Sequence, residues 1–375
     1  MVDLNGIVEP TLLLDEEKCR ENICFMAEKA RRHKLRFRPH FKTHQSRAIG
    51  AWFKNIGVNT ITVSSLNMAL YFSDAGWTDI TVAFPANLRE IDKINHLAGK
   101  VKLNLLLTAA ETAKILARRL KGRVGVFIKV DTGYHRAGIF SGRVGEIDEV
   151  LRAIDRSRRL EFRGFLAHAG NTYAARTRSE ILKIHHRTLM QLNRLKVRYR
   201  NEFPGLILSL GDTPACSVAD DFNGIDEIRP GNFVFYDVMQ YRLGVCPWNR
   251  IAVCLACPVV ARNASRNELV IYGGAVHFSK EYILGEKGDR NFGLVVRLRK
   301  DGWSRPIAGM HLAQLSQEHG IIKGGRRDLE RFKIGDIVGV LPVHSCLTAN
   351  LMKGYQTTAG VKLDYLPATL TFPAP

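Results

Sequence analysis

The chain has 375 residues, of which 46% are hydrophobic, so it can bury at least one sizeable core and we expect one large and one smaller domain. Its formal charge is +19, from 55 basic against 36 acidic residues, a surplus that would suit nucleic acid or anionic small molecules. The basic residues are spread along predicted helices without an aromatic-interleaved patch. We therefore interpret the charge as a solvated surface, and expect neither a nucleic-acid nor a membrane partner.

The first residues lack a basic region followed by an apolar run, and no later segment approaches the ~18 apolar residues of a membrane span. Seven cysteines, an odd number without a secretory signal, indicate reduced thiols. Cys254 and Cys257 form a CxxC, but they lie in a predicted strand, where residues three apart point to opposite faces. We expect a cytoplasmic protein.

Short β-rich apolar runs recur in the first two thirds of the chain, with helical stretches between them. The runs are LRFRP (35–39), GVNTITV (57–63), DITVAF (79–84), VKLNLLLT (101–108), VGVFIKVD (124–131), EFRGFLAH (161–168), LILSLG (206–211) and IDEIR (225–229). The segments between them carry apolar residues at three- and four-residue spacing. This alternation predicts an α/β fold, a (β/α)8 TIM barrel over roughly residues 15–245.

After Arg250 the pattern changes to β-rich runs separated by Gly, Asn and Asp turn signals, with little helical periodicity. Residues 246–375 therefore predict a second, mostly β domain. The opening run IVEPTLLLD precedes the first barrel helix and could add a strand to it, so we include residues 1–14.

Lys42 lies between two histidines in RPHFKTH, just past the first predicted barrel strand, where catalytic residues of such barrels gather. An amine that reacts with a carbonyl needs a fixed position and neighbours that help it to lose its proton. Other polar or small residues follow later strands at the same rim: Asp131, Arg136, Gly138, His168, Asn171, Tyr173, Ser209, Gly211, Thr213, Gly231 and Asn232. Segments after strands seven and eight often hold a phosphate, so this rim suggests pyridoxal phosphate.

His344 and Cys346 lie two residues apart in the predicted β domain. On a strand they would face the same side, where an imidazole and a thiolate could meet one cation such as zinc. Two protein ligands are too few for a closed structural site, but they fit a catalytic site with open positions.

The motifs RPHFKTH, VDTGYHRAG, HAGNTY, SLGDTP, RPGNFVFYD and VLPVHSC together resemble the alanine racemase-like, fold-type III pyridoxal-phosphate enzymes, in the branch of D-serine dehydratases and D-threonine aldolases. The resemblance runs from about residue 10 to about residue 360. It implies that Lys42 is the Schiff-base lysine and that Arg136 lies beside the cofactor ring or the substrate carboxylate. It assigns ring and phosphate binding to His168, Tyr173, Ser209, Gly211, Thr213, Gly231 and Asn232, and Zn2+, or another divalent metal, to His344 and Cys346.

The resemblance implies a homodimer that carries out a metal-assisted β-elimination on a small D-3-hydroxy amino acid, giving a keto acid and ammonia. One alternative is aldol cleavage to glycine and an aldehyde; a racemase would need bases on both faces and no metal. A noncatalytic pyridoxal-phosphate carrier would need Lys42 but no second domain. His277, Lys280 and His319 are further candidates for the rim that we leave unassigned.

Overall fold

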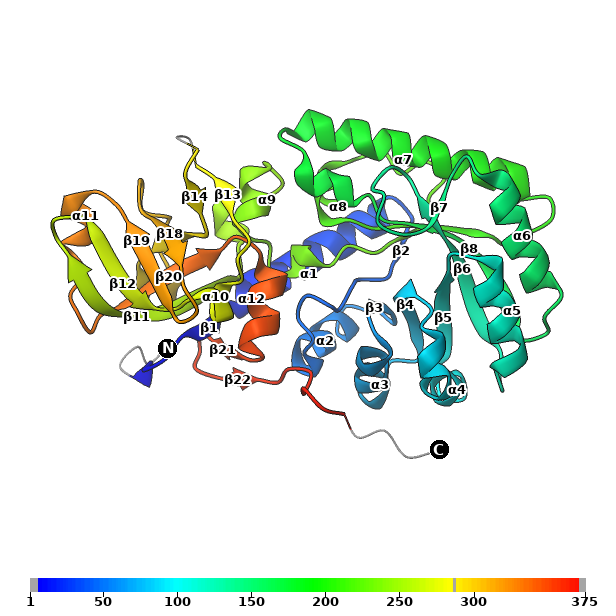
Figure 1. Ribbon diagram of the computed structural model, residues 1–375, viewed down its shortest axis with the longest axis horizontal. Coiled ribbons are helices and arrows are strands. Elements are labelled where there is room, and N and C mark those ends of the chain that lie inside the picture. Colours follow the sequence, from blue (N-terminus) through cyan, green and yellow to red (C-terminus); the bar gives the residue numbers. More distant parts are fainter. Residues whose placement is uncertain (1–5, 286–287, 371–375) are drawn as a thin grey trace. The chain divides into compact units, whose positions relative to one another are not determined.

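The computed structural model describes residues 6–285 and 288–370 (Figure 1). Their contacts form two units. The barrel unit comprises Phe25–Gly231 and the described residues from Leu366 onward, and the β unit comprises Asn232–Tyr365 and the described residues up to Cys24. The sequence predicts these divisions at 14/15 and 245/246 instead. Helix α1 (Glu16–Arg32) contains the first observed division, which falls between Cys24 and Phe25.

The eight strands predicted for the barrel are all present and pair in parallel. They are β2 (Arg36–Phe37), β3 (Thr60–Val63), β4 (Asp79–Pro85), β5 (Lys102–Leu107), β6 (Val124–Asp131), β8 (Leu160–Ala167), β9 (Ile207–Leu210) and β10 (Glu227–Ile228), in the order β2-β10-β9-β8-β6-β5-β4-β3. A parallel bridge between His40 and Thr62 links the two ends of this order. The prediction of a TIM barrel is therefore confirmed, with the short β7 (Ile139–Phe140) paired to β6.

Helices alternate with these strands around the barrel (Figure 1). They are α2 (Arg47–Lys54), α3 (Leu66–Asp74), α4 (Ile91–Ala98), α5 (Ala110–Arg119), α6 (Val144–Asp155), α7 (Arg178–Tyr199) and α8 (Thr213–Val218), with 3-10 turns at Leu88–Glu90 and Gly170–Ala174. Hydroxyl caps start several of them: the Thr177 side chain accepts a hydrogen bond from the Glu180 amide at 3.2 Å and begins α7.

The barrel interior holds apolar side chains from neighbouring strands and also a buried polar network, in which Arg38 donates to Glu227 and to Asp79, each at 2.6 Å. Leu106, Phe127 and Leu166 form one buried cluster, against which Ala83 and Ile207 pack. Strand β6 is buried along nearly its whole length, as a parallel strand covered on both faces should be. The interior is therefore a packed core of apolar and paired polar groups, and the candidate site lies in the loops at the strand ends.

The β unit is built on one mostly antiparallel sheet. Its strands are β1 (Thr11–Leu14), β11 (Val253–Asn263), β12 (Glu268–Tyr272), β15 (Gly293–Val296), β18 (His311–Leu315), β19 (His319–Lys323), β20 (Ile337–Pro342), β21 (Tyr355–Thr357) and β22 (Lys362–Leu363), in the order β12-β19-β18-β15-β20-β11-β1-β21-β22. β12 also pairs with β11. The opening run indeed joins this sheet, with Leu13 opposite Cys254.

Shorter elements complete the β unit. They are two small hairpins, β13 (Ile283–Leu284) with β14 (Arg290–Asn291) and β16 (Leu298–Arg299) with β17 (Gly302–Trp303), the helices α9 (Val238–Arg242), α10 (Ala275–Phe278), α11 (Arg326–Leu329) and α12 (Ser345–Met352), and 3-10 turns at Asn232–Val234 and Trp248–Arg250. Among the helices that the structure describes, none is both long enough and apolar enough to cross a membrane.

Our expectation that His344 and Cys346 share a strand is wrong. Strand β20 ends at Pro342, and α12 begins at Ser345, with His344 as its extended N-cap residue. The chain turns here because the buried Asp237 carboxylate accepts hydrogen bonds from the Ser345 amide (3.1 Å) and hydroxyl (3.4 Å). The two candidate ligands therefore come from a strand-to-helix turn.

Candidate active site

Lys42 lies in the turn that follows β2 and the His40 bridge. The preceding Phe41 is fully buried, with its ring centroid about 5 Å from those of Phe53, Phe72 and Trp77. On the other side of the lysine, the Gln45 side chain donates to the Lys42 carbonyl at 3.1 Å. The backbone is thus fixed on both sides, while the Lys42 side chain is exposed. This is the setting that a reactive amine requires.

Several cationic or imidazole side chains gather around this lysine. Burial, and then the charges of Lys42 and Arg229, hold the pKa of His40 well below its ordinary value. Burial, followed by Lys129 and Lys42, does the same to the pKa of His168. Burial, with help from Arg229 and Arg136, lowers the pKa of the buried Lys129 amine to about 7. Both histidines are therefore neutral here, and the positive field favours an anion such as a phosphate or a carboxylate.

Arg136 lies in the loop after β6 and is exposed to solvent. Its guanidinium carbon is 5.0 Å from the centroid of the Tyr134 ring, and the Tyr134 ring in turn meets His168 edge-on at 5.9 Å. The loop itself is held by Asp131, which accepts backbone hydrogen bonds from Gly133, Tyr134 and His135. The structure thus brings Arg136 and His168 to the same end of the barrel as Lys42.

The loops after β8 and β9 meet beside His168. The His168 imidazole contacts the Gly211 carbonyl through Nδ1, and the Thr213 amide donates to the Tyr173 hydroxyl at 3.2 Å. Asp212 caps α8, accepting from the Ala215 amide (2.7 Å) and the Thr172 hydroxyl (2.9 Å). Burial raises the pKa of Asp212 to about 6. His168, Tyr173, Gly211 and Thr213, all expected at the site, are therefore together.

Two of the predicted site residues are glycines for a steric reason. A Cβ atom on Gly211 would lie 2.8 Å from the Arg229 carbonyl oxygen, and one on Gly231 would lie 2.8 Å from the His40 carbonyl oxygen. Real Cβ atoms do not approach backbone so closely. These glycines let the last strand loops pack against each other and against the lysine turn.

Ser209 and Asn232 have different surroundings from the other predicted cofactor ligands. Ser209 is buried on β9, where its hydroxyl donates to Glu227 at 2.6 Å and accepts from the Arg229 Nε at 2.7 Å. Asn232 belongs to the β unit, where its amide nitrogen donates to Asp237 at 2.7 Å and to the Ser345 hydroxyl at 3.0 Å. Ser209 thus supports Arg229, and Asn232 supports the turn that carries His344 and Cys346.

His344 and Cys346 meet in the β unit. Burial alone would lower the pKa of His344, but the hydrogen bond and charge of Cys346, together with Asp237 and Glu281, raise that pKa to about 9. The Asn232 amide nitrogen also lies 3.6 Å from the Cys346 sulfur. An imidazole beside a thiol and two carboxylates is an environment that stabilises a cation.

The residues present fit both groups that the sequence suggested. At the barrel rim, an exposed amine lies among cationic and neutral imidazole groups, which suits the aldehyde and phosphate of pyridoxal phosphate. In the β unit, the His344 Nδ1 is buried and has no hydrogen-bond partner among the described residues, which leaves it available to a metal beside the Cys346 thiol. Within the described ranges, His, Cys, Asp and Glu form no group of three that could hold a metal.

Two residues at these sites were missed from the sequence. Arg229 is buried and donates to Ser209 and to the Ala167 carbonyl (2.6 Å), which places its charge under the rim. Asp237 is 1% exposed and anchors Asn232, Gln240 and Ser345. They are the first and last residues of the motif RPGNFVFYD, but sequence position alone does not reveal which partners a buried charge will find.

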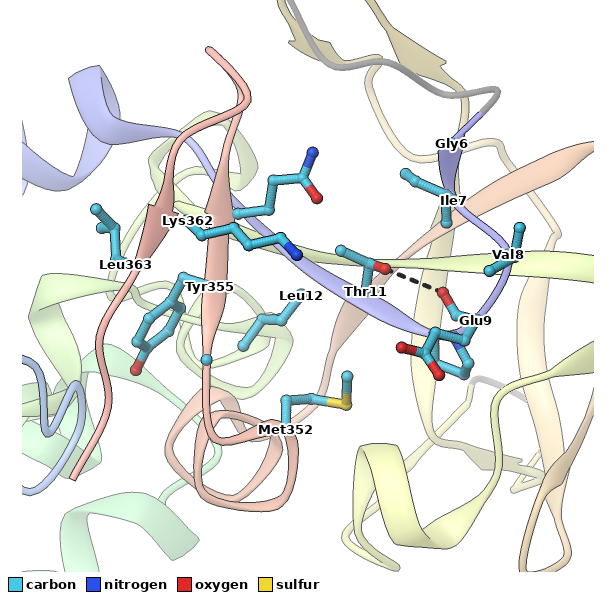
Figure 2. A pocket seen from close by; sticks show the side chains of 13 residues that line it. Gly6, Ile7, Val8, Glu9, Thr11, Leu12, Met352, Tyr355, Lys362 and Leu363 are labelled. Atoms are coloured by element: carbon cyan, nitrogen blue, oxygen red, sulfur yellow. Dashed lines mark hydrogen bonds between the residues drawn. The ribbon is translucent and has the colours of Figure 1, made fainter. Parts of the chain in front are cut away.

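A groove of about 540 Å³ opens elsewhere in the β unit, beside the paired strands β1 and β21 (Figure 2). It is lined by Ile7, Glu9, Leu12, Met352, Tyr355 and Lys362, among others. Figure 2 shows the Lys362 side chain extending into it toward Thr11. Its lining includes no predicted site residue, so we do not assign the reaction to this groove.

Two protein-family matches cover most of the chain. Residues 14–238 match the family described as alanine racemase, N-terminal domain, and residues 252–358 match the putative serine dehydratase domain. The first match alone covers more than half of the chain. The combination of these two domains agrees with the barrel unit and the β unit seen in the structure.

Individual relatives match over nearly their whole length. The chain is 28% identical over 385 residues to a D-serine dehydratase of Dictyostelium discoideum, covering 94% of each chain. It is 29% identical over 365 residues to a D-threo-3-hydroxyaspartate dehydratase of Delftia sp., covering 93% of this chain and 94% of the relative. A metal-free cysteine-to-alanine mutant of a D-threo-3-hydroxyaspartate dehydratase superposes with a TM-score of 0.90 at 25% identity, covering 97% of this chain and 99% of that one.

The motifs, the turn that carries Lys42 at the barrel rim and these matches agree with one another. The chain belongs to the alanine racemase-like, fold-type III pyridoxal-phosphate enzymes, in the branch of D-serine dehydratases and D-threonine aldolases, and is a pyridoxal-phosphate-dependent lyase.

Proposed function

We propose that the enzyme removes water from a D-3-hydroxy amino acid with the help of zinc, and that it releases a keto acid and ammonia. The observation that carries this proposal is the His344–Cys346 pair, in which a buried imidazole nitrogen without a hydrogen-bond partner among the described residues lies beside a thiol and could hold a metal that acts on the substrate. The dehydratases that match along more than nine tenths of both chains support elimination over aldol cleavage.

Bound pyridoxal phosphate would supply an electron sink for the carbanion that forms at Cα. Lys42 would first hold the cofactor and then, once the substrate amine replaces it, accept the Cα proton on its Nζ. Its fixed backbone between Phe41 and Gln45 keeps that nitrogen at one place.

The phosphate would be held by groups on the loops after β8, β9 and β10. The hydroxyls of Tyr173 and Thr213 and the backbone at Gly211 and Gly231 are the groups that this part of the rim offers. Arg136 would bind the substrate carboxylate, because it is exposed at the same rim. His168, neutral and tied to the Gly211 carbonyl, would pack beside the cofactor ring.

His344 and Cys346 would hold the zinc, whose chemistry is to make the β-hydroxyl a better leaving group as a Lewis acid. The Cα–H and Cβ–O bonds break, the hydroxyl takes up a proton and leaves as water, and the released enamine hydrolyses to the keto acid and ammonia. Asp237 and Asn232 would keep the turn that carries both ligands in place. The soft thiolate favours zinc over a harder metal.

The direct test is to incubate the purified holoenzyme with D-serine, D-threonine and D-threo-3-hydroxyaspartate in turn, and to assay keto acid, ammonia, glycine and aldehyde together. We expect keto acid and ammonia in equal amounts from at least one substrate, with no glycine. Glycine and an aldehyde in equal amounts would show instead that the enzyme is an aldolase.

The family resemblance also implies an active homodimer. Sedimentation of the holoenzyme at micromolar concentration should give twice the mass of one chain. A fully active monomer under these conditions would contradict the dimer without affecting the proposed reaction.

A further inference from the structure

Two neighbouring segments of the barrel unit hold a large part of the chain's positive charge. Residues 114–123 and 152–163 contain ten arginines and lysines and two carboxylates, which gives these 22 residues a net charge of +8 out of the chain's +19. The basic residues are Lys114, Arg118, Arg119, Lys121, Arg123, Arg152, Arg156, Arg158, Arg159 and Arg163. We call this set the basic surface. All of its members except the half-buried Arg163 are exposed.

The fold brings these two segments side by side. They comprise the C-terminal parts of the adjacent helices α5 and α6 (Figure 1), the loops that lead into β6 and β8, and the first residues of β8. These two strands pair with Val124 opposite Leu160, so the loops before them are neighbours. The Val124 amide donates to the Arg159 carbonyl at 3.0 Å. The positive charge therefore forms one continuous surface at the end of the barrel where the strands begin.

The basic surface lacks the counter-charges found elsewhere on this protein. Among the described residues, its only ion pair joins Arg163 to Glu161 at 2.5 Å. Other surface cations pair with carboxylates, for example Arg143 with Glu146 at 3.0 Å and Arg326 with Glu330 at 2.9 Å. Lys114 and Arg118 are also four residues apart on α5, a spacing at which like charges destabilise a helix. A surface with uncompensated repulsion is the kind that binds an anion.

The surface is hollowed where the two helices meet. A groove of about 520 Å³ has small side chains in its lining, including Ala110, Ala117 and Ala153. The other residues that line it are Lys114, Arg118, Glu149, Arg152 and Arg156, four cations and a single carboxylate. A chain of anionic groups could lie along this groove with arginines on both sides, each able to donate two hydrogen bonds to a phosphate.

The residue types favour a ligand that consists of phosphates alone. Within the described segments 110–123 and 144–163 there is no exposed aromatic ring to stack on a base, and no Asn or Gln to read a base edge. None of the exposed large hydrophobic side chains lies there either, so the surface has no apolar anchor for a membrane. We propose that the basic surface binds a linear polyphosphate chain.

Such binding would leave the lyase reaction untouched. Strand β6 has eight residues from Val124 to Asp131, so the basic surface and the rim loops are separated by about 23 Å along the strand. The basic surface could therefore bind a polyanion while the rim remains accessible to small substrates.

The test measures the anisotropy of an end-labelled polyphosphate with the holoenzyme, in which bound cofactor occupies the phosphate site at the rim. The variant Arg118→Glu/Arg156→Glu reverses two charges of the groove. The matched control Arg187→Glu/Arg194→Glu makes the same change in net charge on exposed arginines of α7. We expect the groove variant to raise the Kd at least tenfold and to reduce the slope of log K against log salt by about two. The control should change the Kd less than twofold.

Each of the other outcomes would overturn the proposal. Equal losses in both variants would mean that only the net charge matters, and no binding at low salt would mean that the surface is merely solvated. Tighter binding of single-stranded RNA with the same number of phosphates, or of anionic lipid vesicles, would identify a different partner. Thermal melting and lyase activity, unchanged in both variants, check that the substitutions have not disturbed the fold.

Discussion

The barrel rim and the strand-to-helix turn of the β unit each hold a buried or half-buried histidine, and the two surroundings act on it in opposite directions. At the rim, burial and the charges of Lys129 and Lys42 lower the pKa of His168. In the β unit, Cys346, Asp237 and Glu281 outweigh burial and raise the pKa of His344 to about 9. A cation-rich site is suited to an anion and an anion-rich site to a cation. The rim is therefore suited to the phosphate of the cofactor, and the turn in the β unit to a metal ion.

The barrel and the β unit also position their groups differently. In the barrel, parallel strands bring Lys42, His168 and Thr213 to one end because every strand runs in the same direction. In the β unit, a single buried carboxylate, Asp237, fixes one turn. The rim should therefore tolerate loss of one supporting contact better than the turn does.

Removal of the Lys42 amine should have the largest effect on activity. We expect Lys42→Ala to lower keto-acid production by at least three orders of magnitude, since the substitution removes both the cofactor's covalent anchor and the base. Borohydride treatment followed by mass analysis should find no cofactor attached to the chain, and Lys42→Arg should behave in the same way. Attachment to another lysine would show that the rim has been assigned to the wrong amine.

Loss of the thiolate should affect the reaction but leave the cofactor in place. In Cys346→Ala, or after chelation, we expect the visible absorbance of the bound cofactor to persist while elimination slows by several orders of magnitude, because Lewis-acid stabilisation is typically worth several kcal/mol at ~1.4 kcal/mol per tenfold. Added Zn2+ should restore the chelated wild type but not the variant. Unchanged activity after chelation would mean that His344 and Cys346 have a purely structural role.

Asp237 tests whether the turn depends on its single carboxylate. Asp237→Asn keeps the size of the side chain but removes its charge, and we expect zinc affinity, measured by competition with a chromophoric chelator, to fall 10- to 100-fold, roughly the range typical of residues that orient metal ligands. Cofactor absorbance should not change. Glu268→Gln, which removes a buried carboxylate paired with Arg266 in the same unit, is the matched control. An equal loss in the control would mean that the effect is not local.

The smallest effect concerns the stability of the barrel in acid. His185 is 3% exposed, its Nε2 lies 2.6 Å from the Asp221 carbonyl, and burial lowers its pKa. Below the ordinary value of about 6.5, the unfolded chain binds a proton that the folded chain does not, so this histidine reduces the free energy of unfolding as the pH falls, by up to about 1.4 kcal/mol per pH unit. Asp212, with its pKa raised to about 6, acts in the opposite direction.

The variant His185→Gln isolates the contribution of the histidine. Denaturant melts between pH 7 and pH 5 should give a shallower dependence of stability on pH than the wild type, by about one proton. If the two dependences were identical, His185 would be protonated in the folded barrel, and its burial would have to be offset by a charge that we have not identified.

The strand alternation and the rim residues could be read from the sequence because they depend on local patterns. Eight apolar runs with helical periodicity between them are enough to specify a parallel barrel, and the barrel then fixes which loop ends meet. The position of Lys42 just past the first strand follows from that rule. The roles of Ser209 and Asn232 could not be read in the same way, because each hydrogen-bonds a buried charge, Arg229 or Asp237, that only the tertiary structure brings near.

The sequence by itself determined the class of fold, since that depends on the local spacing of apolar residues, and its motifs predicted Lys42 and the His344–Cys346 pair as site residues through their resemblance to the family. Only the tertiary structure decided that His344 and Cys346 leave a strand through a helical turn, that Asp237 holds that turn, and that the basic residues of two separate segments form one surface. The physical reason is that a buried polar group must find a partner, and that partner can lie anywhere along the chain.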